Sequence, residues 1–93
     1  MKIAINTTWG GFGLSKAAYE FLNLPWDGYG YDFDDEEKRT DPDLIRCIET
    51  LGSAAASGEH AEVKVVEIPD GTDFYIHNYD GIETIHEHHK SWS

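Results

Sequence analysis

The residues whose types and spacing could carry a function lie between Trp26 and Asp43. This stretch, WDGYGYDFDDEEKRTDPD, holds eight carboxylates, two cations and four aromatic rings in eighteen residues. It supplies −6 of a net charge of −11. Crowding like charges costs repulsion that salt screens but does not abolish, so fold stability gives no reason for it. Interleaved Trp and Tyr residues are typical of interface hot spots.

We therefore expect a partner-binding surface in this acidic, aromatic-rich segment at 26–43. Carboxylates spaced like phosphates can occupy a groove that normally receives nucleic acid, and charge complementarity speeds such an encounter. The expected anchors are Trp26, Tyr29 and Tyr31. The expected charges are Asp32, Asp34, Asp35, Glu36, Glu37, Asp41 and Asp43. The alternative is a solvated loop whose rings pack into the core.

A glycine-rich loop, GGFGLSK, follows a predicted strand and precedes a predicted helix. Such loops can hold phosphate groups on exposed backbone N–H groups. The spacing fits neither the dinucleotide fingerprint nor the P-loop, and Lys16 is the one nearby cation. The pattern favours a tight strand-to-helix turn, with a nucleotide site at Gly10–Gly13 as the alternative.

The histidines of HEHHK at 86–90 raise the possibility of metal binding. On a helix, His86 and His89 share a face with Ile85, so we expect two half-buried histidines. A metal site using His86 and His89 is the alternative, and it needs further ligands from elsewhere. Cys47 falls on the apolar face of a predicted helix, which indicates a buried thiol rather than a nucleophile. The leading expectation is thus a protein that is not an enzyme, with no metal and no cofactor.

The composition limits the classes of molecule that the protein could bind. The chain has 93 residues, with 18 acidic against 7 basic, which fits one domain and disfavours direct binding of nucleic acid or acidic lipid. A basic protein surface is the favoured partner. A single cysteine, no leader-like N-terminus and no long apolar run predict a cytoplasmic protein without a membrane span.

The periodicity predicts the elements that position these residues. MKIAIN reads as a strand, Ser15 as the cap of a helix, and Asp41-Pro42 as the start of a second helix that ends at Gly52. The runs flanking Pro69-Asp70-Gly71 read as a hairpin, and 80–92 as a helix with Asp80 and Glu83 in a capping box. The order β-α-α-β-β-α predicts one α+β domain over 1–93, with about three helices and a three-stranded, mainly antiparallel sheet.

Four segments carry a family resemblance. MKIAINTTWGGFGLSKAAYEFL at 1–22, RTDPDLIRCIETLG at 39–52, AEVKVVEIPDG at 61–71 and YDGIETIHEHHKSW at 79–92 cover most of the chain. They resemble a widespread family of short, mostly uncharacterised bacteriophage proteins. The region between Leu22 and Arg39 is shorter and more acidic than the charged insert of many members. The resemblance implies a phage or prophage origin, and small acidic phage proteins include anti-CRISPR and anti-restriction proteins that mimic DNA.

The leading hypothesis is a phage-encoded inhibitor of a host defence system. It would bind a basic nucleic-acid-binding host protein, such as a CRISPR effector subunit, through the segment at 26–43. The alternatives are the small metal- or nucleotide-binding module and a phage accessory protein with no inhibitory role.

Overall fold

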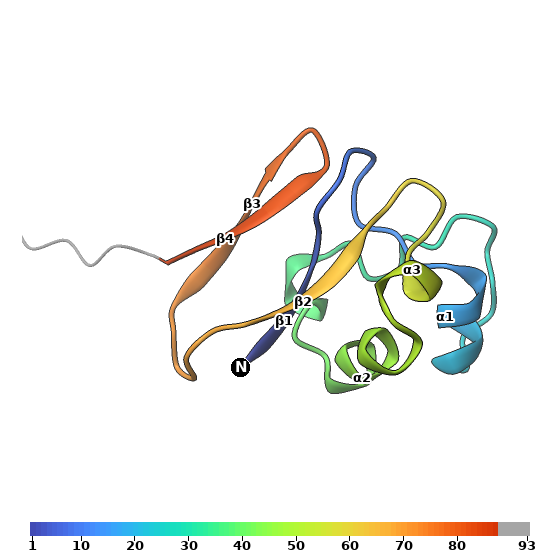
Figure 1. Ribbon diagram of the computed structural model, residues 1–93, viewed down its shortest axis with the longest axis horizontal. Helices are drawn as coiled ribbons and strands as arrows, with labels where there is room; N and C mark the ends of the chain where they lie inside the picture. The colour runs from blue at the N-terminus through green and yellow to red at the C-terminus, as the bar shows by residue number, and fades with distance from the viewer. Residues whose placement is uncertain (88–93) are drawn as a thin grey trace, which may run out of the picture.

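The computed structural model describes residues 1–87 and confirms an α+β fold (Figure 1). Its elements follow one another as β1 (Lys2–Asn6), α1 (Lys16–Phe21), the 3-10 turn η1 (Glu36–Lys38), α2 (Pro42–Leu51), α3 (Ser53–Ala56), β2 (Val63–Glu67), β3 (Phe74–Tyr79) and β4 (Ile82–Glu87).

The strands form two antiparallel pairs. β1 pairs with β2 in a register that runs from Lys2 opposite Glu67 to Asn6 opposite Val63, and β3 pairs with β4. The predicted three-stranded sheet is therefore wrong, as is the hairpin around Pro69-Asp70-Gly71. Turn residues allow the chain to reverse direction but do not determine which strand pairs with which. Here β2 pairs with the N-terminal strand, and the loop at 68–73 leads to a second pair.

The helix predicted at 80–92 is also wrong within the described residues, because Ile82–Glu87 is strand β4. Asp80 and Gly81 form a two-residue loop in which φ is 51° and 91°. Asp-Gly is the preferred sequence for such primed hairpin turns, which need positive φ at both positions. The chain forms this turn rather than the helix that the capping-box pattern predicts. The β-branched residues after the turn favour a strand.

β1 lies between the helices and the β3–β4 hairpin, as Figure 1 shows. Ala4 belongs to the core that α1, α2 and α3 share with Val63 and Val65 of β2. Ile5 faces the other way, into a groove of about 360 Å³ that it lines with Val66 and Ile85. The strand is buried from Ile3 to Asn6 because both of its faces are covered.

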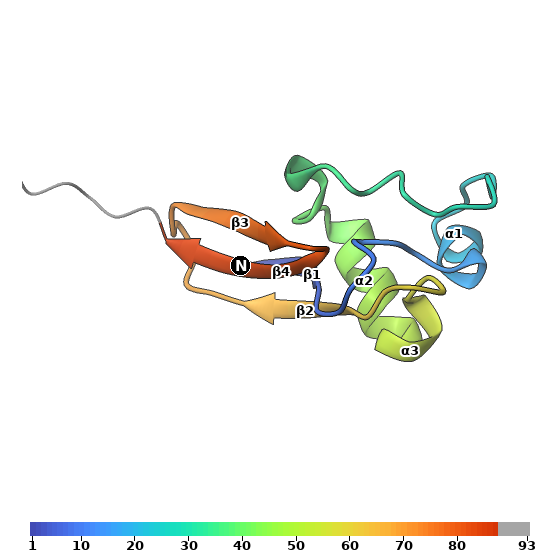
Figure 2. The ribbon, with the colours of Figure 1, turned by 90° about the horizontal axis from the view of Figure 1, so that it is seen from above.

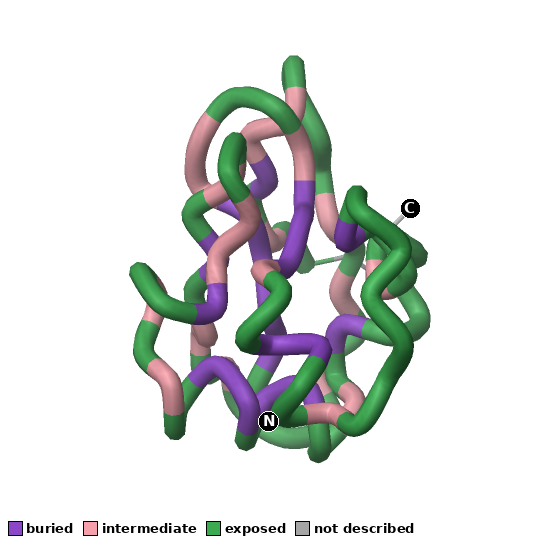
Figure 3. The backbone as a smooth tube through the Cα atoms, turned by 90° about the vertical axis from the view of Figure 1, so that its right-hand side faces the viewer, coloured by how far each residue is buried: buried purple, intermediate pink, exposed green. Residues whose placement is uncertain are grey.

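Helices α1 and α2 begin where the sequence predicts. The Ser15 side chain accepts a hydrogen bond from the Ala18 N–H at the start of α1, and Asp41 accepts one from the Asp43 N–H at the start of α2. α2 directs Leu44, Ile45, Cys47 and Ile48 into the core and ends at Gly52, where φ is 86°. Figure 3 shows the buried residues gathered inside a shell of exposed loops. Over residues 1–87, none of the helices has the length and apolarity needed to cross a membrane.

Candidate functional site: an acidic ledge beside an aromatic pocket

The acidic segment passes over the surface from the end of α1 to the β3–β4 hairpin (Figure 2). Its middle is attached to α1 and the glycine loop. The Leu14 N–H donates to the Gly30 carbonyl at 2.9 Å, and the Asp32 N–H donates to the Tyr19 hydroxyl at 3.0 Å. Burial raises the pKa of Tyr19 to about 12, so this hydroxyl stays neutral.

Arg39 anchors the far end of the segment. Its guanidinium makes two hydrogen bonds of 2.5 and 2.8 Å to the Glu83 carboxylate on β4 and donates to the Phe33 and Asp34 carbonyls. It also stacks over the Phe12 ring, 3.9 Å from the centroid. Arg39 is 1% exposed, so this cation is used to hold the fold together rather than to neutralise the surface.

Five carboxylates form what we call the acidic ledge: Asp32, Asp34, Asp35, Glu36 and Glu37, all exposed. Their contacts with cations are long. Asp34 lies 3.7 Å from Arg39, and Asp35 lies 4.0 Å from Lys38. The Glu36 carboxylate accepts a hydrogen bond of 2.7 Å from the Ile76 N–H, which ties η1 to the outer edge of β3. The ledge is thus held in place, and its five carboxylates have one exposed lysine, Lys38, beside them.

The other two predicted acids have local roles outside the ledge. Asp41 is half-buried and caps α2. Asp43, in the first turn of α2, pairs with Arg46 at 2.9 Å. An acidic side chain near a helix N-terminus is stabilising because it faces the positive end of the helix dipole. These two positions therefore have a structural explanation, as Glu36 does through the hydrogen bond that it accepts from the Ile76 N–H.

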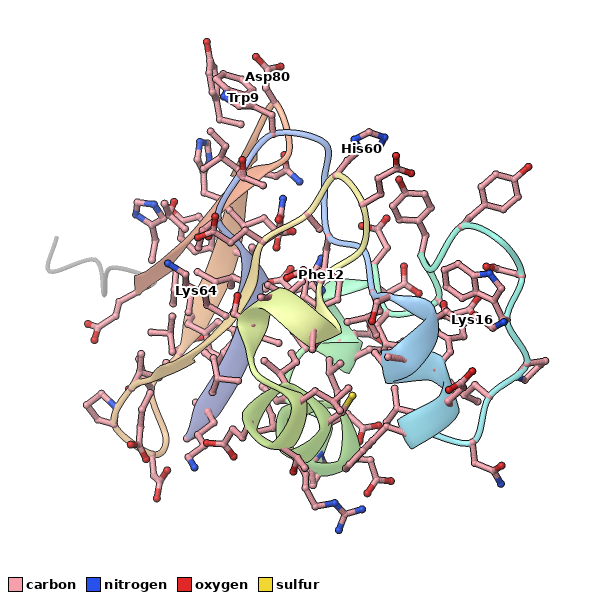
Figure 4. The ribbon with its side chains drawn as sticks, turned by 45° about the vertical axis from the view of Figure 1, so that its right-hand side comes forward. Trp9, Phe12, Lys16, His60, Lys64 and Asp80 are labelled. Atoms are coloured by element: carbon pink, nitrogen blue, oxygen red, sulfur yellow. The ribbon has the colours of Figure 1, made fainter. Side chains whose placement is uncertain are left out.

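The three predicted anchors, Trp26, Tyr29 and Tyr31, lie together on the wall of one pocket of about 460 Å³. The opposite walls come from the glycine loop and from the turn at 58–61, with Lys16, Glu59 and His60 at the pocket. Figure 4 shows Lys16 beside the first turn of α1 and His60 at the tip of the loop that leads into β2. The structure thus joins the rings to the glycine loop, two features that are separate in the sequence.

Close packing explains Gly10 of the loop, and it also explains Gly81 of the β3–β4 turn. A Cβ on Gly10 would lie 2.5 Å from the His60 carbonyl oxygen, and one on Gly81 would lie 2.4 Å from the Gly11 nitrogen. The loop therefore lies against both the 58–61 turn and the β3–β4 turn. Figure 4 shows Trp9 and Asp80 next to each other at the tips of these loops. This close approach supports the interpretation as a tight turn.

The histidine prediction is wrong for His86, and His89 lies outside the described residues. His86 is exposed on β4, stacks on Tyr75 with centroids 5.5 Å apart, and lies 2.8 Å from the Thr84 hydroxyl. The strand, with its period of two, turns this ring away from the side where a helix would have placed it. Within the part of the chain that the structure describes, no three His, Cys, Asp or Glu side chains are grouped to hold a metal ion.

Two parts of this site were missed from the sequence. One is the 58–61 turn, whose Gly58 N–H donates to the Gly13 carbonyl at 2.9 Å and so closes the pocket. The other is Glu83, which was assigned to a helix cap. The signal was a single acid among apolar and β-branched residues, and its burial is explained by Arg39 and the Asn6 N–H, which both donate to its carboxylate. No family model, curated protein or solved structure matches this chain.

Proposed function

We propose that the protein is a phage-encoded inhibitor of a host defence system that binds a basic, nucleic-acid-binding protein surface. The acidic ledge takes the place of a stretch of nucleic acid in a Lys- and Arg-lined groove, such as that of a CRISPR effector subunit. The encounter takes place in the host cytoplasm and involves no catalysis by this chain.

One observation carries the proposal: the ledge is both highly charged and fixed in place. Five carboxylates stand on seven consecutive residues, 32–38, with Lys38 as the one cation among them. The buried Arg39–Glu83 pair and the Glu36–Ile76 hydrogen bond hold the backbone that presents them. A surface arranged before binding loses less conformational entropy on binding than a mobile acidic loop.

The test is a charge-neutral ledge variant, Asp34→Asn/Asp35→Asn/Glu36→Gln/Glu37→Gln. In Glu36→Gln the amide oxygen keeps an acceptor for the Ile76 N–H, and the other three side chains make no short hydrogen bond through their carboxylates in the described structure. Binding to host proteins is measured by pull-down from lysate over a range of salt concentrations, followed by inhibition assays against the captured complex. The ledge variant should lose capture and inhibition, and the wild-type interaction should weaken steeply with salt.

A matched control removes the same amount of charge elsewhere. Glu20→Gln/Glu67→Gln/Asp80→Asn/Glu87→Gln neutralises four exposed carboxylates that lie outside the ledge. This control should retain capture and inhibition. If both variants lost capture and inhibition equally, net charge alone would explain the effect. Full capture and inhibition by a folded ledge variant would reject the proposal.

A further inference from the structure

We infer that the aromatic pocket beside the ledge is a binding site for an arginine side chain of the basic partner. The inference rests on the proposed function and adds a chemical preference to it. A field of carboxylates attracts lysine and arginine alike, whereas rings arranged around a pocket distinguish them.

The pocket offers exposed ring surface on fixed supports. Trp26 is 39% exposed, Tyr31 47% and Tyr29 74%. Trp26 makes an edge-to-face contact with buried Tyr19, with centroids 5.1 Å apart, and Tyr31 lies against Gly13. The backbone N–H groups of Tyr29 and Gly30 donate to the Asp27 carboxylate at 2.8 and 2.9 Å, so the chain around Tyr29 is also held.

A guanidinium suits this surface better than an ammonium. It is planar, weakly hydrated and stacks on aromatic faces, and a cation is attracted to the ring faces. The fold already uses this contact once, where Arg39 stacks over Phe12 at 3.9 Å. Glu59 supplies a carboxylate at the pocket, and the ledge begins at Asp32, directly after Tyr31. A partner with neighbouring basic residues can therefore occupy both features at once.

The backbone argues against a phosphate in the same pocket. Phosphate sites of this kind need free N–H groups, and three of the N–H groups at the pocket are already used: those of Leu14, Ser15 and Gly58 donate to the carbonyls of Gly30, Ala56 and Gly13. The Ala18 N–H donates to the Ser15 side chain. Among the described residues, Lys16 is the one lysine or arginine that lines the pocket, in a chain of net charge −11. Lys16 opposes an incoming arginine, so its removal should strengthen arginine binding.

The experiment compares hexa-arginine with hexa-lysine peptides, titrated into the full chain by calorimetry and by amide NMR shifts. Wild type should bind hexa-arginine about 3- to 10-fold more tightly than hexa-lysine, with shifts at Gly13, Gly28 and Gly58 for hexa-arginine alone. Tyr29→Ala should remove most of this preference, and Lys16→Gln should increase it. Tyr79→Ala, which removes a tyrosine that is 66% exposed on the hairpin, is the matched control and should leave the preference unchanged.

Equal affinity for the two peptides overturns the inference, as does weaker arginine binding by Lys16→Gln. Saturable binding of AMP that is lost in Lys16→Gln would assign the pocket to an anionic ligand instead and also overturns it. The ledge variant separates the two proposals. If it weakens both peptides while wild type shows no arginine preference, the ledge function stands and the pocket inference fails. If the ledge variant binds both peptides as tightly as wild type and the preference for hexa-arginine persists, the pocket inference stands and the ledge function fails.

Discussion

Arg39 and Glu83, 44 residues apart in the chain, form a bidentate ion pair that is buried between the acidic segment and the β3–β4 hairpin. The Glu83 carboxylate also accepts the Asn6 N–H of β1 at 2.8 Å. A single carboxylate thus joins the ledge, the first strand and the hairpin. Removing one member of such a pair leaves the other charged, buried and without compensation.

We therefore expect Glu83→Ala to lower the free energy of unfolding by about 3–5 kcal/mol, measured by urea denaturation. The double variant Arg39→Met/Glu83→Leu should recover a large part of this loss, because it removes both charges. Arg46→Ala, which breaks the exposed Asp43–Arg46 pair, is the control and should cost less than about 1 kcal/mol. A Glu83→Ala protein as stable as wild type would contradict the central role of the pair.

The sequence predicts the parts of this fold that depend on neighbouring residues. The caps at Ser15 and Asp41, the stop at Gly52 and the inward face of α2 all follow from spacing. What it does not predict is which strands pair, because Pro69-Asp70-Gly71 and Asp80-Gly81 are both acceptable hairpin turns and only the second is used as one. The choice depends on contacts distant in sequence, such as β1 against β2.

The candidate site likewise has a part that the sequence predicts and a part that it does not. The ledge and the three rings were predicted because charge density and residue type are visible in a local stretch. The pocket was not, since its walls come from 11–16, 26–31 and 58–61, which meet only in the fold. The sequence shows Arg39 only as one of two cations in the segment, and its burial depends on Glu83, which lies 44 residues further along the chain.

The β3–β4 turn should depend on Gly81 more strongly than the turn at 69–72 depends on Gly71. Gly71 and Gly81 have similar φ, 80° and 91°, but a Cβ on Gly71 meets open space whereas one on Gly81 would meet the Gly11 nitrogen at 2.4 Å. We expect Gly71→Ala to cost about 1–2 kcal/mol from backbone strain alone. Gly81→Ala should cost a further ~1–3 kcal/mol, because the glycine loop must move. Equal losses in urea denaturation would show that the two loops are not in close contact.

Asp41 should influence stability through its cap and not through its charge. Its carboxylate accepts the Asp43 N–H at 2.8 Å, a hydrogen bond that an asparagine side chain can also accept. Asp41→Ala should therefore destabilise the protein by roughly 0.5–2 kcal/mol, and Asp41→Asn by much less. Thermal unfolding followed by circular dichroism measures both. If Asp41→Asn were as damaging as the alanine variant, charge rather than capping would be the dominant contribution.

Asp27 should couple the rim of the aromatic pocket to pH. Hydrogen bonds from the backbone N–H groups of Gly30 and Tyr29 hold the pKa of this carboxyl below its ordinary value. A lowered folded pKa means that the stabilisation is fully present above the ordinary value of about 3.9 and is lost as the pH falls through the lower folded value. The turn at 27–30 should therefore stay intact at about pH 5 and loosen only in strong acid. Carboxyl-detected NMR titration should place the Asp27 midpoint below about 3.9, with the Tyr29 and Gly30 amide shifts following the same curve. In Asp27→Asn that titration should vanish from both amides, and a wild-type midpoint at or above the ordinary value would show that the two N–H groups do not hold the carboxylate in solution.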